Sequence, residues 1–227
     1  TIDAVKCEVL PVEVIVRGYI TGSAWRDYQA GNTVSGIQMP EGLAMNQKLP
    51  QPILTPSTKE EGGEHDRPIS RDEIIESSLI RKELWEEVES AALRLFERGT
   101  EIAADRGLIL VDTKYEFGLL DGKLVLVDEV HTPDSSRYWY ADSYHNLFET
   151  GAKQKKLDKE YLRQWLMEYG FRGEGKAPQI PDNVRAEVAV RYIKAYEEIT
   201  GENFQPKSTD IEAEKQTVLS YIIENCG

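Results

Sequence analysis

The chain has 227 residues, enough for one large domain or two small ones around a sizeable hydrophobic core. Its 40 acidic and 27 basic residues give a formal charge of −13. This charge disfavours nucleic-acid binding, because a polyanion is repelled. A few cations in a cleft can still bind small anionic substrates. Two distant cysteines and the lack of a secretion signal or of an apolar run of about 18 residues predict a cytoplasmic protein without membrane association.

Residues 4–20 are rich in valine and isoleucine and alternate around Pro11, which predicts one strand or two short strands joined there. A glycine-containing turn follows, and then a short helix is expected over residues 23–30. Arg17, the hydroxyl of Ser23 and nearby backbone N–H groups could form a cradle for an anion. The alternative, which is the commoner role for such a residue, is a solvated or salt-bridged arginine.

Residues 32–68 show no periodicity and contain many prolines and glycines, so we expect a long loop with a functional role. His65 within it is a candidate metal ligand. A lone histidine is more often a surface or hydrogen-bonded residue, however, and no second histidine is spaced to help it.

A capping box formed by Ser70 and Glu73 predicts a helix from Arg71, broken near Ser77 and ended by Gly107. Its apolar residues recur every three to four positions, which is typical of a helix that packs on a core. The expected buried stripe is Leu84, Val88, Ala91, Leu95 and Ile102, widened by Trp85, Ala92 and Phe96.

Two β-rich runs flank Asp121-Gly122, which is the strongest short-range signal for a β-hairpin. The length of the turn decides which side chains share a face. With a two-residue loop, Glu116 pairs near Val127 and Asp128 falls on the opposite face. With a three-residue loop closed by a bulge, Lys114 pairs with Asp128, and Glu116 lies diagonally beside it.

Two carboxylates beside a lysine suit Mg²⁺, which is usually bound by one or two carboxylates plus substrate phosphates. Only the three-residue turn lets Glu116 and Asp128 share one cation. Lys114 would supply a point charge, and Arg137 could clamp a second anion. The alternative is a salt-bridged hairpin with a structural role.

Beyond Trp139 we expect mostly helix: at 158–169, from about 182 to Gly201, and after Ser208. The apolar stripes of these helices are interpreted as core packing. They comprise Leu162, Trp165, Leu166, Val188, Tyr192, Ile193, Tyr196, Ile199, Ile211, Val218, Leu219 and Ile222.

The sequence resembles the SAICAR synthetase family, the phosphoribosylaminoimidazole-succinocarboxamide synthases. Four blocks carry the resemblance: VLPVEVIVRGYITGSAW (9–25), LPQPILTPSTKEEGGEHDRPIS (49–70), GLILVDTKYEFG (107–118) and VDEVHTPDSSRYW (127–139). The resemblance implies an α+β fold, a kinase- or ATP-grasp-like large domain with an antiparallel sheet and packed helices.

The implied organisation is a central ATP- and ribonucleotide-binding domain over residues 1–140 that continues into a helical C-terminal region over 141–227. The family's small N-terminal β lobe, which covers the phosphates of ATP, has no counterpart in this sequence. No G-x-G-x-x-G or Walker-type run replaces it, so we expect weak ATP binding by these residues alone.

The implied activity is an ATP-dependent ligase of de novo purine biosynthesis. It condenses carboxyaminoimidazole ribonucleotide (CAIR) with L-aspartate to SAICAR, releasing ADP and phosphate, with Mg²⁺ as the ion. ATP would phosphorylate the carboxylate, and the amine of aspartate would displace phosphate. The alternatives are a non-catalytic fragment that retains ribonucleotide binding or an interaction surface, such as that of a homo-oligomer, and a small-molecule kinase.

The resemblance also implies roles for individual residues. The metal ligands are Glu116 and Asp128. The groups nearest the chemistry are Lys114 and Asp112. The substrate-binding residues are Arg17, Ser23 and Arg137 for the ribonucleotide phosphate, with Lys59 and Asp66 in the long loop. The nucleotide-binding residues are Glu8, Val9 and Leu10, whose backbone meets adenine, with Glu116 and Asp128. Five cations, Arg17, Lys59, Arg67, Lys114 and Arg137, would make the pocket positive.

Overall fold

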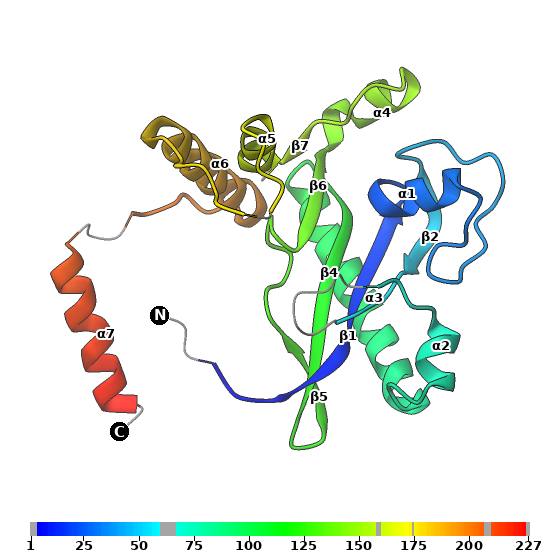
Figure 1. The fold of residues 1–227 in the computed structure, drawn as a ribbon, viewed down its shortest axis with the longest axis horizontal. Coiled ribbons are helices and arrows are strands. Elements are labelled where there is room, and N and C mark those ends of the chain that lie inside the picture. The colour runs from blue at the N-terminus through cyan, green and yellow to red at the C-terminus, as the bar shows by residue number, and fades with distance from the viewer. Residues whose placement is uncertain (1–3, 60–66, 158–159, 174, 207–209, 226–227) are drawn as a thin grey trace.

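The computed structural model describes residues 4–59, 67–157, 160–173, 175–206 and 210–225. Its centre is a sheet in which every strand pairing is antiparallel, with the long strands in the middle (Figure 1). The strands lie in the order β2 (Lys48–Leu54), β1 (Glu8–Tyr19), β4 (Leu108–Leu120), β6 (Ser136–Tyr140) and β7 (Lys156–Leu157), while β3 (Ser57–Thr58) pairs with β1 and β5 (Lys123–Val127) pairs with β4. The expected α+β class with an antiparallel sheet is confirmed.

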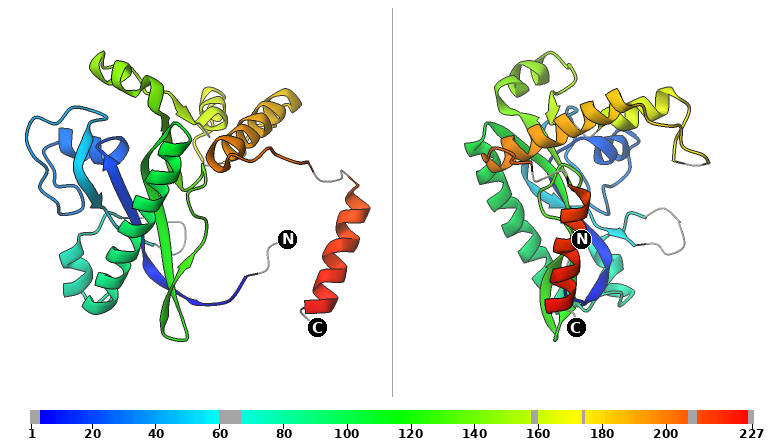
Figure 2. Two further views of the ribbon diagram at one scale, coloured as in Figure 1. Left: turned by 180° about the vertical axis from the view of Figure 1, so that it is seen from behind. Right: turned by 90° about the vertical axis from the view of Figure 1, so that its left-hand side faces the viewer.

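The helix α3 (Lys82–Asp105) covers one face of this sheet (Figures 1 and 2). The other helices are α1 (Gly22–Gln29), α2 (Arg71–Glu76), α4 (Ala141–Glu149), α5 (Glu160–Glu168), α6 (Asp182–Thr200) and α7 (Ile211–Asn225). In the described part of the chain, none of the helices has the length and apolar character needed to cross a bilayer.

The buried face of α3 is rotated from the expected one. The residues expected only to widen the stripe, Trp85, Ala92 and Phe96, are its core, whereas Ile102 is 38% exposed. Two adjacent stripes satisfy a three-to-four-residue spacing, and the largest side chains decide which of them packs on the sheet.

The loop expected over residues 32–68 contains two strands, so that expectation is wrong in part. Pro50 and Pro52 disguise β2 in the sequence, but β2 is an edge strand, where an N–H on the outer side needs no partner. Pro11 does not divide β1, which runs as one strand with a register shift between Val9 and Glu13.

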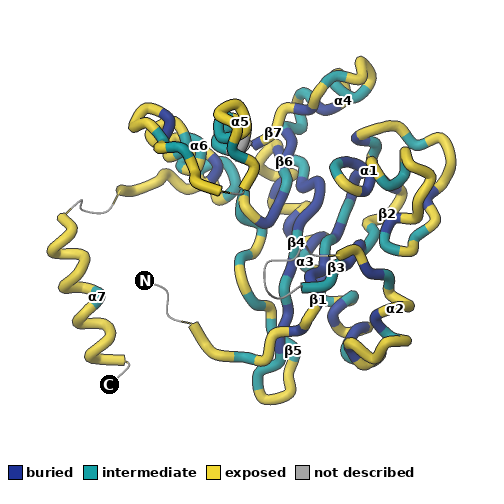
Figure 3. The backbone as a smooth tube through the Cα atoms, in the orientation of Figure 1, coloured by how far each residue is buried: buried dark blue, intermediate teal, exposed yellow. Residues whose placement is uncertain are grey.

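The C-terminal helices form where expected, but the stripe of α7 is not a core. Ile211 is 68% exposed, Leu219 51% and Ile222 43%, and α7 buries none of its described side chains (Figure 3). In α6 the buried residues are Val184 and Ala195, which were not in the expected stripe, whereas Tyr192 and Tyr196 of that stripe are each 40% exposed. An apolar stripe indicates a face that could be buried, and it carries no information about which surface covers it.

The capping box at the start of α2 is confirmed. The amide of Glu73 donates to Ser70 Oγ (3.2 Å), and the amide of Ser70 donates to Glu73 Oε2 (2.8 Å). We expect Ser70→Ala to lower the free energy of unfolding by about 1 kcal/mol, measured by urea denaturation. Ser220→Ala, at an exposed position inside α7, is the control and should change little.

This effect should depend on pH. Hydrogen bonds from the Ser70 amide and from the Ser70 hydroxyl, each 2.8 Å from Glu73 Oε2, lower the pKa of Glu73 below its ordinary 4.5, and Ser70→Ala removes the second of them. A carboxylate with a depressed folded pKa stabilises the fold above the unfolded pKa and loses that contribution as the pH falls through the folded one. The difference between Ser70→Ala and the unchanged chain should therefore shrink below about pH 4.5, and a constant difference would contradict the capping-box explanation.

Candidate functional site

The charged residues gather on the face of the sheet opposite α3. The valines of β1 point into the core with α3, so the alternating residues Glu13 and Arg17 point to the other face. In the pairing of β4 with β6, a register shift between Leu110 and Asp112 changes the face to which the following side chains point. The register then places Arg17 opposite Asp112 and Glu13 opposite Glu116, so all four side chains share one face.

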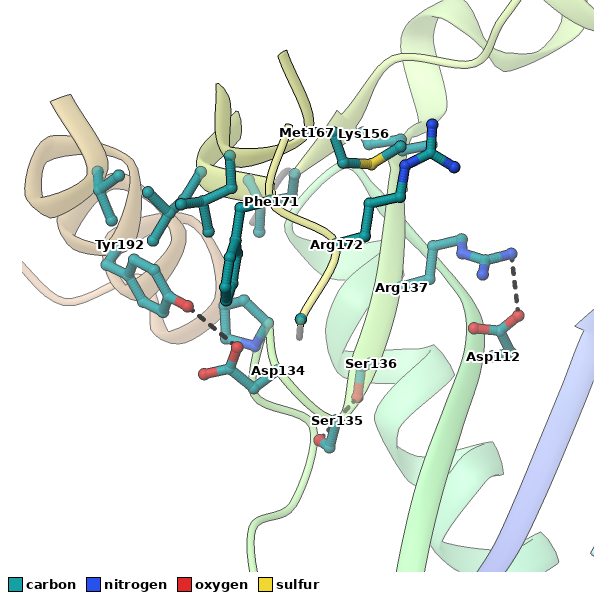
Figure 4. A pocket seen from close by; sticks show the side chains of 16 residues that line it. Asp112, Asp134, Ser135, Ser136, Arg137, Lys156, Met167, Phe171, Arg172 and Tyr192 are labelled. Atoms are coloured by element: carbon teal, nitrogen blue, oxygen red, sulfur yellow. Dashed lines mark hydrogen bonds and ion pairs between the residues drawn. The ribbon is translucent and has the colours of Figure 1, made fainter. Parts of the chain in front are cut away.

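At one end of this face, Asp112 lies between Arg17 and Arg137. Figure 4 shows its contact with Arg137. Arg17 donates to Thr55 Oγ1 (2.8 Å), to Asp112 Oδ2 (3.4 Å) and to Ser23 Oγ (3.1 Å). Arg137 Nη1 lies 3.2 Å from the same Oδ2. Burial and the like charge of Arg137 lower the pKa of Arg17, and Asp112 opposes the shift. The residues expected to hold a phosphate are thus brought together.

The N-terminus of α1 faces the same arginines. Gly22 has φ 61°, and a Cβ on it would lie 3.0 Å from Arg137 Nη2, so a larger residue would crowd the guanidinium. The N-cap residue, Thr21, makes no side-chain cap and donates to Asn46 Oδ1 instead. The first-turn N–H groups of α1 therefore have no side-chain cap, and together with two guanidinium groups and a hydroxyl they suit an anion.

At the other end, two glutamates lie directly opposite each other, and lysines compensate their repulsion. Lys114 Nζ lies 2.7 Å from Glu13 Oε1 and 3.3 Å from Glu116 Oε1, and Lys59 is ion-paired with Glu116 Oε2. Burial disfavours both charged forms, but the partners outweigh it: the pKa of Lys114 is raised and that of Glu116 is lowered. Lys114 and Glu116 are therefore both charged near pH 7.

The expectation of a positive pocket made by five cations is wrong. Arg67 is 60% exposed in its side chain and pairs with Glu73 instead. The other four cations alternate with three carboxylates, namely Glu13, Asp112 and Glu116. Glu13 was missed in the sequence because it fits the outward phase of an alternating strand, although it is only 9% exposed.

The hairpin has the two-residue turn, so the three-residue alternative is wrong. Glu116 pairs with Val127, and the turn is Asp121-Gly122, with φ 52° and 74°. Asp128 follows the end of β5 with φ 63°, so the alternation of the strand no longer dictates where its side chain points. Register alone therefore does not place Asp128 beside Glu116. Asp66 and His65 lie outside the described residues.

Metal ligation by a cluster of three or more His, Cys, Asp or Glu side chains is not found in the described part of the chain. Each carboxylate oxygen of Glu116 contacts a lysine cation in this structure, so binding of Mg²⁺ by Glu116 would replace one of these contacts.

The start of β1 offers backbone groups. Glu8 and Val9 pair with β4 on one side. On the other side, β3 and β2 pair only with residues from Val12 onward, so within the described residues Glu8–Leu10 have no strand partner there. This edge is where an adenine ring could be met by N–H and C=O groups.

A pocket of about 920 Å³ opens beside the arginines and runs towards α5 and α6 (Figure 4). Ser135, Ser136, Lys156 and Arg172 line its polar side, and apolar side chains of α5 and α6 line the other. The volume lies within the range of small-molecule sites.

The sequence profile of SAICAR synthetase matches residues 2–180. The phosphoribosylaminoimidazole-succinocarboxamide synthase of Bacteroides thetaiotaomicron is 51% identical over 223 residues, covering 96% of this chain and 71% of that protein. The enzyme of that name from Bacteroides fragilis is 53% identical, with the same shares covered.

Solved structures agree. The SAICAR synthase of Saccharomyces cerevisiae complexed with SAICAR is 39% identical, with a TM-score of 0.75, covering 88% of this chain and 64% of that chain. A SAICAR synthetase in complex with ADP is 27% identical, with a TM-score of 0.62, covering 88% and 67%. Like these proteins, the chain is a member of the SAICAR synthetase family, the ligases of that name in purine biosynthesis.

Proposed function

We propose that the chain carries the reaction site of an ATP-dependent ligase that joins CAIR to L-aspartate and yields SAICAR, ADP and phosphate. Residues 1–140 would hold ATP and the ribonucleotide, and the helical region over 141–227 would close one side of the pocket. The observation that carries the proposal is the shared face of β1 and β4, which holds the Arg17–Asp112–Arg137 cluster at one end and the lysine–glutamate cluster at the other.

These ends suit a substrate with two anionic groups. Asp112 and Glu116 are four residues apart on one strand, or roughly 13 Å. Arg17, Ser23 and Arg137 would bind the ribonucleotide phosphate. The reacting carboxylate would then lie towards Lys114, whose ammonium group offsets negative charge where it accumulates. Lys59 and Asp66 would bind substrate from the loop after β3. Asp112 would orient the ribonucleotide from within the arginine cluster, and Glu8–Leu10 would receive adenine.

The proposed reaction has two steps, phosphorylation of the carboxylate and then formation of the amide. A carboxylate oxygen of CAIR attacks the γ-phosphorus, the bond to ADP breaks, and an acyl phosphate forms. The amine nitrogen of aspartate then attacks the acyl carbon, the carbon–oxygen bond to phosphate breaks, and the nitrogen loses a proton. The observed register does not bring Asp128 to the face of Glu116, so a shared ion requires the left-handed backbone at Asp128 to turn its carboxylate back towards that face. On that condition Glu116 and Asp128 would hold Mg²⁺, which supplies charge neutralisation of phosphate oxygens when bound.

The test is to follow oxygen. CAIR labelled with ¹⁸O in its carboxylate should transfer one labelled oxygen to inorganic phosphate for each ADP released, and release should require L-aspartate. Phosphate without label would contradict activation of the carboxylate. ADP release without aspartate would favour a small-molecule kinase, and ribonucleotide binding without any ADP release would favour a non-catalytic fragment.

Arg137→Ala should weaken ribonucleotide binding by roughly 10- to 100-fold, because charge-assisted hydrogen bonds to a phosphate contribute about 1.5–3 kcal/mol. Isothermal titration with CAIR measures it. Arg98→Ala, which removes an exposed cation from α3 on the opposite face of the sheet, is the control for a general loss of positive charge. An effect of Arg137→Ala confined to ATP affinity would overturn the assigned role.

A further inference from the structure

The loop Asp128–Ser135, which joins β5 to β6, carries proposed ligands at both of its ends. Asp128 begins it, and Arg137 follows it on β6. The loop has no strand partner of its own in this stretch, so something else must fix its path. One residue near its middle, His131, reaches through to the opposite side of the sheet.

The ring of His131 is held between a strand and a helix. Its Nε2 lies 2.6 Å from the hydroxyl of Tyr115, a fully buried residue of β4, and the two rings meet edge to face at 5.6 Å. On the other side lies Gly99 of α3, where an added Cβ would come within 2.3 Å of His131 Cε1. The helix thus has a glycine at the position where the imidazole needs room.

The backbone of the same residue is also held. The carbonyl oxygen of His131 accepts from the hydroxyl of Tyr138, a buried residue of β6, at 2.8 Å. His131 has φ 57°, in the left-handed region, and histidine is among the residues enriched there. Side chain and backbone are therefore fixed by two neighbouring strands of the sheet.

The second half of the loop is tied to this point. Thr132 Oγ1 accepts from the amides of Asp134 and Ser135, both at 3.3 Å, and Thr132 O accepts from the amide of Ser136 at 2.9 Å. The amide of Lys114 then donates to Ser135 O at 2.9 Å. These bonds connect the residue after His131 to Ser136, which precedes Arg137, while Asp128 lies three residues before His131.

We propose that His131 is a positioning residue for the ligand-binding site, whose ring, seated between Tyr115 and Gly99, sets the conformation of the loop that presents Asp128 and Arg137. The inference rests on the proposed function for the identity of the ligands. It does not make His131 a catalytic residue, since its ring lies on the α3 side of the sheet. The feature that supports this role is the packing of the His131 ring against Gly99, because it connects the loop of the site to the core helix α3.

Two variants test it from opposite sides. His131→Asn keeps a residue that tolerates a positive φ but removes the ring. Gly99→Ala keeps the histidine but fills its space, while alanine has the higher helix propensity. Val88→Ala, in the same helix and roughly 16 Å along its axis, is the control for a general loss of core packing.

Two measurements separate positioning from stability. Hydrogen exchange of the amides of Lys114 and Ser136 should speed up at least tenfold in His131→Asn and Gly99→Ala. Mn²⁺ binding in the presence of ADP, followed by electron paramagnetic resonance, should weaken roughly 10- to 100-fold, as when an outer partner of a ligand is removed. Val88→Ala should leave both unchanged under conditions where it is folded. His131→Gln, whose amide can reach Tyr115, should recover part of the loss.

Unchanged exchange at both amides would overturn the inference, and so would faster exchange with unaltered Mn²⁺ and CAIR affinity. An unchanged chain that binds Mn²⁺ with ADP yet shows no aspartate-dependent ADP release would contradict the proposed reaction, while the exchange and binding results would still decide the role of His131. Absence of Mn²⁺ and CAIR binding in the unchanged chain would overturn both.

Discussion

Arg17→Met should abolish measurable ribonucleotide binding and also destabilise the fold. The Arg17 side chain is only 11% exposed, and it makes three separate contacts, with Thr55, Ser23 and Asp112. Methionine fills a similar space without charge, so Asp112, also 11% exposed, loses one of its two cations. Removing one partner of a buried ion pair costs about 3–5 kcal/mol, and since Arg137 remains we expect a loss of about 3 kcal/mol in urea denaturation.

The two effects can be separated by changing the partner as well. In the double variant Arg17→Met with Asp112→Asn, no uncompensated carboxylate remains at this end, so most of the lost stability should return. Affinity for CAIR should stay low, because the guanidinium is still missing. Recovery of both stability and binding would show that Arg17 acts through Asp112 and does not contact the phosphate.

The hairpin shows which structural features could be predicted from the sequence and which could not. Asp121-Gly122 located the turn correctly, because both residues accept the left-handed backbone that a two-residue hairpin demands. The register was left open, since two- and three-residue turns fit the same pattern of apolar residues. The consequence for Asp128 was out of reach, because a single left-handed residue after β5 breaks the alternation on which the argument depended.

Strands that carry the site were harder to predict. The segment around Arg137 was not predicted as a strand, yet it forms β6, which places that arginine opposite Asp112. Only pairing with β4 makes it a strand, and the paired residues, from Thr113–Ser136 to Leu108–Tyr140, are 23 to 32 positions apart in the sequence. Thr55, which holds Arg17, follows the edge strand that prolines concealed. Local propensity does not record such long-range partners.

The second large effect is expected at the other end of the site. Asp128→Asn should leave the fold intact, because Asp128 is exposed and has no ion pair within the described residues. Turnover should fall at least about 100-fold, since a neutral amide replaces one of two proposed carboxylate ligands of a divalent ion. The dependence on Mg²⁺ concentration should move to higher values, and Mn²⁺ binding with ADP should weaken in parallel.

The hairpin supplies a closely matched control. Asp121, in the turn, is also exposed and also has a positive φ, 52° against 63° for Asp128. Asparagine tolerates this backbone as well as aspartate does, so neither substitution strains the chain. Asp121→Asn removes the same charge from the same hairpin, and it should leave Mg²⁺ dependence and turnover unchanged. Equal losses of turnover in the two variants would mean that Asp128 acts only through the net charge of the hairpin. A loss confined to Asp128→Asn would place the ion at the Asp128 carboxylate, a position that the strand register alone does not predict.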